Sequence, residues 1–288
     1  MNLISKSANA SSAVSDIKHP QFFTRMKPKH EALIIRIKGA DIKEVADQVA
    51  SEIGFTLNVN QKQVVTLLCT PTELDAMAIG FLLSEGILDK RESLLELHVD
   101  EESFTVSLTL KDLPDDIDTT FNKKTITSGC GRGITYTDAS SLKKLPANRS
   151  LTRISPGEIK SLMGEFRSIS SLFLETGGVH SAALAAQGQI ELFSEDIGRH
   201  NAVDKLLGKA FLAGISVQDK ILLSSGRISG EIMTKVIRNR IPILISRTAP
   251  TCMSITYAED HGVTLVGFAR GHRMNIYTHP QRIILSDE

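Results

Sequence analysis

One cysteine in this chain has the surroundings typical of a reactive thiol. Cys130 stands in the segment Thr-Ser-Gly-Cys-Gly-Arg-Gly at 127–133, between two glycines and close to Arg132. Glycine frees the backbone and lets a partner approach closely, and a nearby cation favours the thiolate, which is the reactive form of cysteine. The other interpretation is a glycine-rich turn in which the cysteine is incidental. These seven residues alone do not decide between the two.

The number and spacing of the cysteines argue against a disulfide-stabilised protein and against a cysteine metal site. Cys69 ends the apolar run 64–69, and such apolar neighbours are typical of a buried structural cysteine. Cys252 is far from both other cysteines in the sequence. Three widely spaced cysteines exclude a disulfide framework, and no pair has metal-ligand spacing. A free thiol persists in a reducing compartment, so we expect a cytoplasmic protein without a metal site.

Four loops of the second half are rich in arginine, glycine and hydroxyl groups. They follow predicted strands at 194–201, 225–230, 247–251 and 269–273. Ligands of α/β sheets bind at the carboxyl ends of strands, and both guanidinium groups and helix N-termini bind phosphate. If the loops converge, they form a cationic pocket for a phosphorylated ligand. The alternative for each arginine is a carboxylate partner or solvent, and for any one of them alone that alternative is favoured. The arginines of these loops are Arg199, Arg227, Arg247, Arg270 and Arg273.

Two histidines beside these loops could orient a substrate or act as a base. His180 begins a predicted strand, and His200 lies at a helix start, where a neutral ring is favoured. Each could equally be a hydrogen-bonded core histidine. Several familiar motifs are missing: the dinucleotide-binding glycine pattern fails at Ile134, and neither a phosphate loop nor a zinc deaminase signature is present.

The first region, 31–120, predicts a small α/β domain. Strands are expected at 32–37, 55–59 and 104–110. A helix is expected to begin at a capping box formed by Thr70 and Glu73 and to end at Gly86. Residues 1–30 are expected to be a mobile basic tail, and 112–118 a surface linker.

The second region, 121–288, predicts a larger α/β domain that carries the cysteine segment and the arginine loops. A capping box at 155–158 opens a helix expected to reach Phe173, and Gln187-Gly188 joins a hairpin. Beyond residue 199, helices alternate with short apolar strands at 221–224, 242–246 and 263–268. This alternation is typical of a parallel sheet covered by helices on both faces.

Composition excludes some partners. The chain has 288 residues, enough for about two domains, and 33 basic residues balance 33 acidic ones. This balance gives no electrostatic case for nucleic acid or an anionic membrane. Neither a secretory signal nor a membrane span is expected, because no apolar stretch is long enough.

The loops, read together, resemble the FdhD/NarQ family. The block Glu-Asp-Ile-Gly-Arg-His-Asn-Ala-Val-Asp-Lys at 195–205 is highly specific, and the resemblance runs from about residue 45 to the end. The other matching segments are Gly-Phe-Leu-Leu-Ser-Glu-Gly-Ile at 80–87, Gly-Gly-Val-His at 177–180, Ser-Gly-Arg at 225–227, Ile-Pro-Ile-Leu-Ile-Ser at 241–246, Ala-Pro-Thr at 249–251 and Leu-Val-Gly-Phe-Ala-Arg-Gly-His-Arg-Met-Asn-Ile-Tyr at 265–277.

This resemblance implies a cytoplasmic sulfurtransferase that assists formate dehydrogenase maturation. The implied protein takes sulfur from a cysteine desulfurase as a cysteine persulfide. It passes the sulfur to the molybdenum (or tungsten) bis-guanine-dinucleotide cofactor. The resemblance further implies a three-layer, cytidine-deaminase-like C-terminal domain without zinc, a smaller N-terminal α/β domain and a homodimer.

The family's functional residues can be placed on this sequence. The persulfide cysteine matches Cys130, and Gly133 stands where many members carry a second cysteine, so one sulfur must act alone. We expect Arg227, Arg247, Arg270 and Arg273 to contact phosphates, with Cys130 reaching over the same pocket. The cofactor-binding segment looks like Phe268, Ala269, Arg270, Gly271, His272 and Arg273.

Two other functions remain open. The protein could be a non-catalytic chaperone of the molybdenum cofactor, in which Cys130 only stabilises its loop. It could also be a nucleotide-dependent acyl-transfer or hydrolytic enzyme, in which Cys130 is the nucleophile and His180 or His200 is the base.

Overall fold

The structure, a computed structural model, describes residues 26–111, 125–126, 134–135, 142 and 144–285. Most of the predicted basic tail, the predicted linker at 112–118 and the segment with Cys130 lie outside these residues. So does the predicted domain boundary near residue 120. Two short strands flank the cysteine segment and pair antiparallel: β7 (Thr125–Ile126) and β8 (Ile134–Thr135).

The first part of the chain builds a four-stranded sheet with one helix packed on it. The strand order is β4-β3-β6-β5; β3 runs parallel to β6, and the outer pairs are antiparallel. Side chains alternate between buried and more exposed along β3, so one face of the sheet packs into the core. The elements are β3 (Ile53–Val59), β4 (Lys62–Cys69), α1 (Leu74–Glu85), the short 3-10 helix η1 (Arg91–Ser93), β5 (Leu94–Asp100) and β6 (Thr105–Leu110).

The predicted start of α1 is wrong, whereas its end is confirmed. The helix begins at Leu74, and Glu73 adopts a left-handed backbone without a side-chain cap. Thr70 does not cap the helix because its backbone N–H and its hydroxyl both donate to Asp196, at 2.9 Å each. Gly86 ends the helix in a left-handed conformation, as the sequence indicated.

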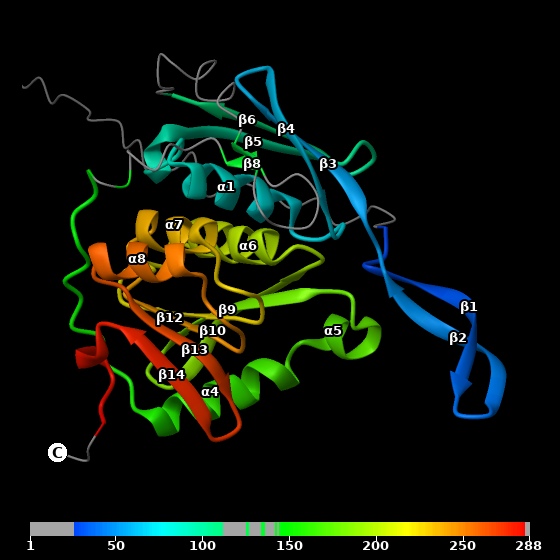
Figure 1. The fold of residues 1–288 in the computed structure, drawn as a ribbon. Helices are drawn as coiled ribbons and strands as arrows, with labels where there is room; N and C mark the ends of the chain where they lie inside the picture. Colours follow the sequence, from blue (N-terminus) through cyan, green and yellow to red (C-terminus); the bar gives the residue numbers. More distant parts are fainter. Residues whose placement is uncertain (1–25, 112–124, 127–133, 136–141, 143, 286–288) are drawn as a thin grey trace, which may run out of the picture.

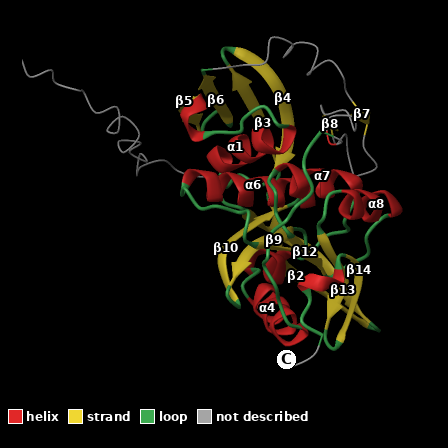
Figure 2. Ribbon diagram, turned by 90° about the vertical axis from the view of Figure 1, so that its left-hand side faces the viewer, coloured by secondary structure: helices red, strands yellow, loops and turns green. Residues whose placement is uncertain are grey.

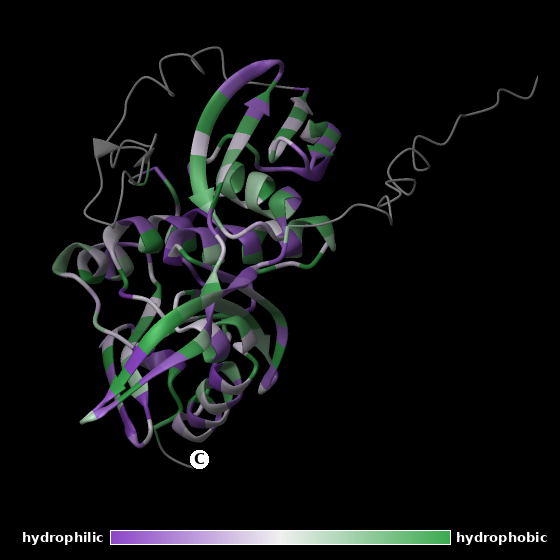
Figure 3. Ribbon diagram, turned by 90° about the vertical axis from the view of Figure 1, so that its right-hand side faces the viewer, coloured by the Kyte–Doolittle hydropathy of each residue, from purple (hydrophilic) through white to green (hydrophobic). Residues whose placement is uncertain are grey.

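A long β-hairpin precedes this sheet and projects away from the body of the molecule (Figure 1). It consists of β1 (Lys29–Lys38) and β2 (Asp41–Ala50), and only its first strand was expected from the sequence. Lys29 forms an ion pair with Glu175 of α5 (Ser171–Thr176). Hydrophobic residues lie along both strands (Figure 3), and Leu33, Ile35, Ile37 and Ile42 are exposed.

The second part is built on a six-stranded sheet of order β10-β9-β11-β12-β13-β14. β11, β12 and β13 are parallel to one another, and β9 and β10 form an antiparallel hairpin, both as predicted. The pairs β9–β11 and β13–β14 are antiparallel. The last strand was not expected. The strands are β9 (His180–Ala186), β10 (Gln189–Asp196), β11 (Ile221–Ser224), β12 (Ile243–Ser246), β13 (Thr264–Arg270) and β14 (Arg273–Thr278).

Helices cover both faces of this sheet, which gives the three layers that were predicted (Figures 1 and 2). One face packs on α6 (Arg199–Leu212), α7 (Gly230–Arg238) and α8 (Cys252–Asp260), and the other packs on α4 (Pro156–Ser168). The Ser155–Glu158 capping box is confirmed at the start of α4. The helix ends at Ser168, however, so Phe173 belongs to α5 instead. The short 3-10 helix η2 (Pro280–Arg282) follows β14.

Two glycines let the two parts of the molecule approach closely, where α1 packs on α6. An added Cβ on Gly80 would overlap the backbone carbonyl of Asp204, and one on Gly208 would overlap that of Ala76.

The mixed α/β fold, with a smaller α/β part before a three-layer unit, agrees with the sequence analysis. Its layers run from the four-stranded sheet through α1 and then α6 to the six-stranded sheet and α4 (Figure 1).

Candidate functional site

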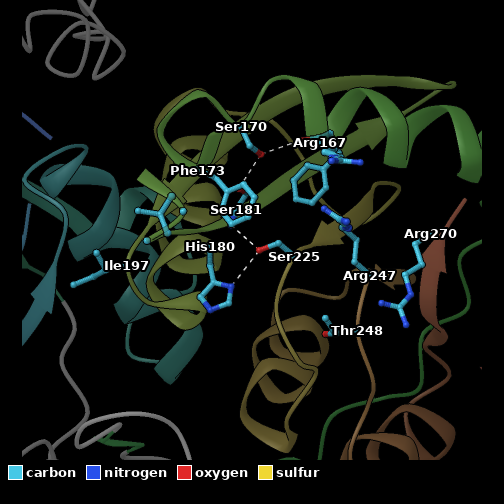
Figure 4. Close-up of a pocket in the computed structure, with 14 residues that line it drawn as sticks. Arg167, Ser170, Phe173, His180, Ser181, Ile197, Ser225, Arg247, Thr248 and Arg270 are labelled. Carbon is cyan, nitrogen blue, oxygen red and sulfur yellow. Dashed lines mark hydrogen bonds between the residues drawn. The ribbon is translucent and has the colours of Figure 1, made fainter. Parts of the chain in front are cut away.

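Two adjoining cavities lie at the carboxyl-terminal edge of the parallel strands. The larger cavity has a volume of about 400 Å³ and the smaller cavity about 250 Å³. Figure 4 shows the larger cavity between α4 and the loops that follow β11 and β12. The position is the one that α/β sheets use for ligands.

Three arginines line both cavities. Arg167 lies on the last turn of α4, Arg247 directly follows β12, and Arg270 ends β13. The smaller cavity adds Lys160 and Arg273, and no aspartate or glutamate lines either cavity among the described residues. Several guanidinium groups without a carboxylate between them make a site for an anion.

The side chain of Ser246, the last residue of β12, links these loops to one another. The hydroxyl of Ser246 donates to the carbonyl of Gly226 at 2.8 Å and accepts from the N–H of Thr248 at 3.1 Å. The carbonyl of Thr248 in turn accepts from the N–H of Phe268 at 3.1 Å. These bonds bring the loop of Arg247 against the strand that ends at Arg270.

The turn between β13 and β14 gathers the arginines over an aromatic ring. Arg270 pairs with Arg273 across the turn, and Gly271 has the positive φ of 60° that the turn requires. The guanidinium carbon of Arg270 lies 5.8 Å from the centroid of the Phe268 ring, and that of Arg273 lies 4.9 Å from it. Cation–π contact thus holds two like charges side by side at the mouth of the site.

The larger cavity has aromatic walls and a row of hydroxyl groups. Phe166 and Phe173 line it, together with Ser170, Ser181 and Ser225. The hydroxyl of Ser225 accepts from the N–H of Ser181 at 2.9 Å, and Ser181 and Ser170 share a hydrogen bond of 2.9 Å.

His180 completes this row. Its Nδ1 lies 3.2 Å from the hydroxyl oxygen of Ser225. Burial lowers the pKa of His180, and the cation of Arg199 and then His200 act in the same direction. The ring is therefore neutral at neutral pH.

The structure does not bring every predicted residue to this site. Arg227 and His272 are exposed and line neither cavity, whereas Ala269 and Gly271 line the smaller one. His200 lies elsewhere: its Nε2 is 3.1 Å from Glu231, and burial lowers its pKa. The four predicted loops all contribute, but 194–201 supplies Ile197 and 225–230 supplies Ser225 in place of an arginine.

Arg167 is the cavity residue that sequence reasoning missed. It lies in the last turn of an amphipathic helix, where a cation is expected because it complements the helix dipole. Nothing in the local pattern distinguishes that role from anion binding. Only the packing of α4 against the six-stranded sheet places Arg167 beside Arg247 and Arg270.

The specific block 195–205 joins the two parts of the molecule and supplies only Ile197 to the cavities. Asp196 binds Lys205 at 2.7 Å, both side chains being fully buried, and both contact Thr70 of the first part. Asp204 accepts from Ser84 and forms an ion pair with Lys235 at 2.7 Å. The charged residues Asp196, Asp204 and Lys205 of this block therefore belong to a buried polar network, in which every member needs its partners.

The two described cysteines differ in their capacity to react. Burial raises the pKa of the Cys69 thiol to about 12, so that thiol stays protonated. Cys252 is exposed at the start of α8, and Cys130 lies outside the described residues. The described part of the chain holds no cluster of three potential metal ligands, and none of its helices is long and apolar enough to cross a membrane.

Comparison with known proteins places this chain in one family. The model of the FdhD/NarQ family matches residues 50–284. The sulfur carrier protein FdhD of Bacillus subtilis is 38% identical over 249 residues, which cover 86% of this chain and 95% of that one. The protein of the same name from Wolinella succinogenes is 40% identical over 248 residues, 85% of each chain.

A solved structure agrees with this placement. The crystal structure of a protein from Desulfotalea psychrophila, named as a formate dehydrogenase accessory protein, covers 90% of this chain with a TM-score of 0.75. It is matched over its whole length, and the sequence identity is 26%. The chain therefore belongs to the FdhD/NarQ family.

Proposed function

We propose that this protein is a sulfur carrier that assists the maturation of a formate dehydrogenase. Cys130 accepts sulfur from a cysteine desulfurase as a persulfide. The sulfur then passes to the molybdenum (or tungsten) bis-guanine-dinucleotide cofactor, which is the cargo of the two cavities. The names of the relatives from B. subtilis and W. succinogenes support sulfur transfer, and that of the D. psychrophila protein supports the formate dehydrogenase.

The observation that carries this proposal is the cationic pair of cavities. A bis-guanine-dinucleotide cofactor brings several phosphates, and guanidinium groups bind phosphate oxygens through two parallel hydrogen bonds. Arg167, Arg247 and Arg270 line both cavities without a carboxylate among the described lining residues. The cavities thus fit an anionic cargo.

The first chemical step follows from thiol chemistry. The Cys130 thiolate attacks the outer sulfur of the desulfurase persulfide, and a new sulfur–sulfur bond forms on Cys130. The sulfur–sulfur bond of the donor breaks, and its cysteine leaves as a thiolate. Gly133 stands in place of a second loop cysteine, so Cys130 carries the sulfur alone.

Maturation of the client enzyme tests this proposal. In cells that lack their own carrier, the wild-type chain is expected to restore formate dehydrogenase activity, and Cys130→Ala is expected to abolish it. Cys252→Ala removes an exposed cysteine and is the matched control, with activity expected to stay at the wild-type level. Full activity with Cys130→Ala would contradict a sulfur carrier.

A second candidate function is a chaperone that holds and delivers the cofactor without carrying sulfur. The cavities support this chaperone function as much as the sulfur carrier, because they can hold the cofactor and no described cysteine lines them. A Cys130→Ala protein that still matures the dehydrogenase, together with an arginine variant of the cavities that does not, would establish this chaperone function.

A further inference from the structure

Glu195 opens the block 195–205 and lines neither cavity, yet its carboxylate binds the helix α5, which carries part of the wall of the larger cavity. We propose that Glu195 is a positioning residue, which caps α5 and thereby holds that wall in place. The inference rests on the proposed function, because it assigns a residue to the site of the cargo. Glu195 acts through α5 and does not reach the cargo itself.

The helix α5 and the segment after it form a continuous wall of the larger cavity. Phe173 lines the cavity from the helix, and residues 177–181 line it from the segment that leads into β9. Figure 4 shows Phe173 and His180 on one side of the cavity and Arg247 and Arg270 on the other. The position of α5 therefore sets the distance between this wall and the arginines.

Packing contributes little to holding α5 in this place. The helix has six residues, and none of them is fully buried. Helices this short are not stable on their own. Ser170 occupies the N-cap position without capping the helix, because its hydroxyl donates to the carbonyl of Phe166 at 3.0 Å. The first turn of α5 thus needs an acceptor from another element.

The carboxylate of Glu195, on the strand β10, supplies that acceptor. Its two oxygens accept from the backbone N–H groups of Leu172 and Phe173, at 3.1 Å each. These are the N–H groups that an N-cap side chain normally satisfies, and the helix dipole favours a negative charge at this end. One of the two bonds is made by Phe173 itself, so the cap directly fixes the backbone that carries this ring.

The backbone of Glu195 is in turn fixed by its neighbours. Glu195 pairs with Ser181 in the ladder between β10 and β9, and the next residue, Asp196, forms the buried ion pair with Lys205. The block 195–205 thus joins the two parts of the molecule through Asp196 and holds a wall of the larger cavity through Glu195.

Hydrogen exchange of the full chain, read by mass spectrometry, tests the cap. Glu195→Ala removes both acceptors, and the amides of 171–176 are expected to exchange about tenfold faster, because two charge-assisted hydrogen bonds are lost. The amides of α4 are expected to exchange as in the wild type. Glu195→Gln keeps one acceptor oxygen and is expected to restore the protection in part.

Two control variants remove charges that do not cap α5. Glu191→Ala is the matched control, because Glu191 lies on the same strand, is exposed and pairs with Lys220 at 3.3 Å. Lys29→Ala removes the partner of Glu175 at the other end of α5, in an exposed ion pair. In both variants the exchange of 171–176 is expected to stay within about twofold of the wild type.

Maturation of the client enzyme shows whether this wall matters for the proposed function. In cells that lack their own carrier, Glu195→Ala is expected to lower formate dehydrogenase activity about tenfold, because a displaced wall no longer orients the cargo. Glu195→Gln is expected to give intermediate activity, and both controls the wild-type level. Circular dichroism checks the fold, and Glu195→Gln keeps the test valid if Glu195→Ala does not fold.

Four results would overturn the positioning role. They are unchanged exchange of 171–176 in the folded Glu195→Ala protein, faster exchange spread equally over α4, no recovery of protection with Glu195→Gln, and wild-type activity of Glu195→Ala where the wild-type chain restores the dehydrogenase. The proposed function fails separately. If the wild-type chain restores no activity but Glu195→Ala speeds exchange in α5 alone, the cap stands and the carrier falls.

Discussion

At the scale of residues, a buried ion pair holds the two parts of the molecule together. Lys205 donates to Asp196 at 2.7 Å and to the hydroxyl of Thr70 at 2.6 Å, and neither charged side chain is exposed. A charge that loses its partner inside a protein cannot recover its hydration. The cost of removing Lys205 therefore far exceeds that of removing a surface lysine.

This argument gives a stability prediction. Lys205→Met leaves Asp196 buried without its cation and is expected to lower the free energy of unfolding by about 3–5 kcal/mol. Lys43→Met breaks the exposed pair with Asp41 at 2.9 Å and is expected to cost less than about 1 kcal/mol. Urea denaturation measures both, and equal effects would contradict the account.

Site residues were predictable from the sequence only where arginines recur in the loops that follow the predicted strands. The loops of Arg247, Arg270 and Arg273 were expected to converge, and these residues line the cavities. Arg167 was missed because its neighbours in space come from strands far along the chain. Arg227 was also expected at the site, but its side chain is exposed to solvent and lines neither cavity. The local sequence pattern placed Arg227 in the right loop and did not show in which direction its side chain points.

At the scale of elements, the contact between α1 and α6 depends on glycine. Gly80 and Gly208 have no Cβ, and the backbones of the two helices therefore come into direct contact. Nearly every side chain of α1 is buried, because the helix is covered by the four-stranded sheet on one side and by α6 on the other.

Glycine replacement tests this close contact. Gly208→Ala would place a methyl group on the carbonyl of Ala76 and is expected to destabilise the protein by about 1–3 kcal/mol. Gly164→Ala in α4 is the control, because nothing lies within 4 Å of the added Cβ. This change is expected to stabilise the protein by about 0.5–1 kcal/mol, since alanine favours helix. Thermal denaturation showing the same sign for both would contradict the packing.

Elements with a strong local pattern were predictable, and those fixed by long-range contacts were not. The apolar strands β11 and β12 and the capped helix α4 follow from periodicity and turn chemistry. The start of α1 was misplaced because Asp196, far along the chain, binds Thr70 in place of a helix cap. The strand β14 lacks a continuous apolar run, and it forms by pairing with β13.

At the scale of the whole molecule, the buried network and the cavities serve different purposes. The block 195–205 ties the first sheet and α1 to the second part through Thr70 and Ser84. The smaller cavity is lined by residues of α4 and of the turn between β13 and β14. The helix α4 lies on the opposite face of the six-stranded sheet from α7 and α8 (Figure 1). The two joined parts thus present a cationic site, and we propose that Cys130 supplies the sulfur chemistry.

Mass spectrometry of the cysteines tests this assignment most directly. The protein is incubated with a cysteine desulfurase and cysteine, and the peptides that carry Cys69, Cys130 and Cys252 are examined for added sulfur. We predict added sulfur on Cys130 alone: burial keeps Cys69 protonated with a pKa of about 12, and exposed Cys252 is the internal control. Unmodified Cys130, or equal addition to Cys252, would contradict the central claim that this protein carries sulfur on Cys130.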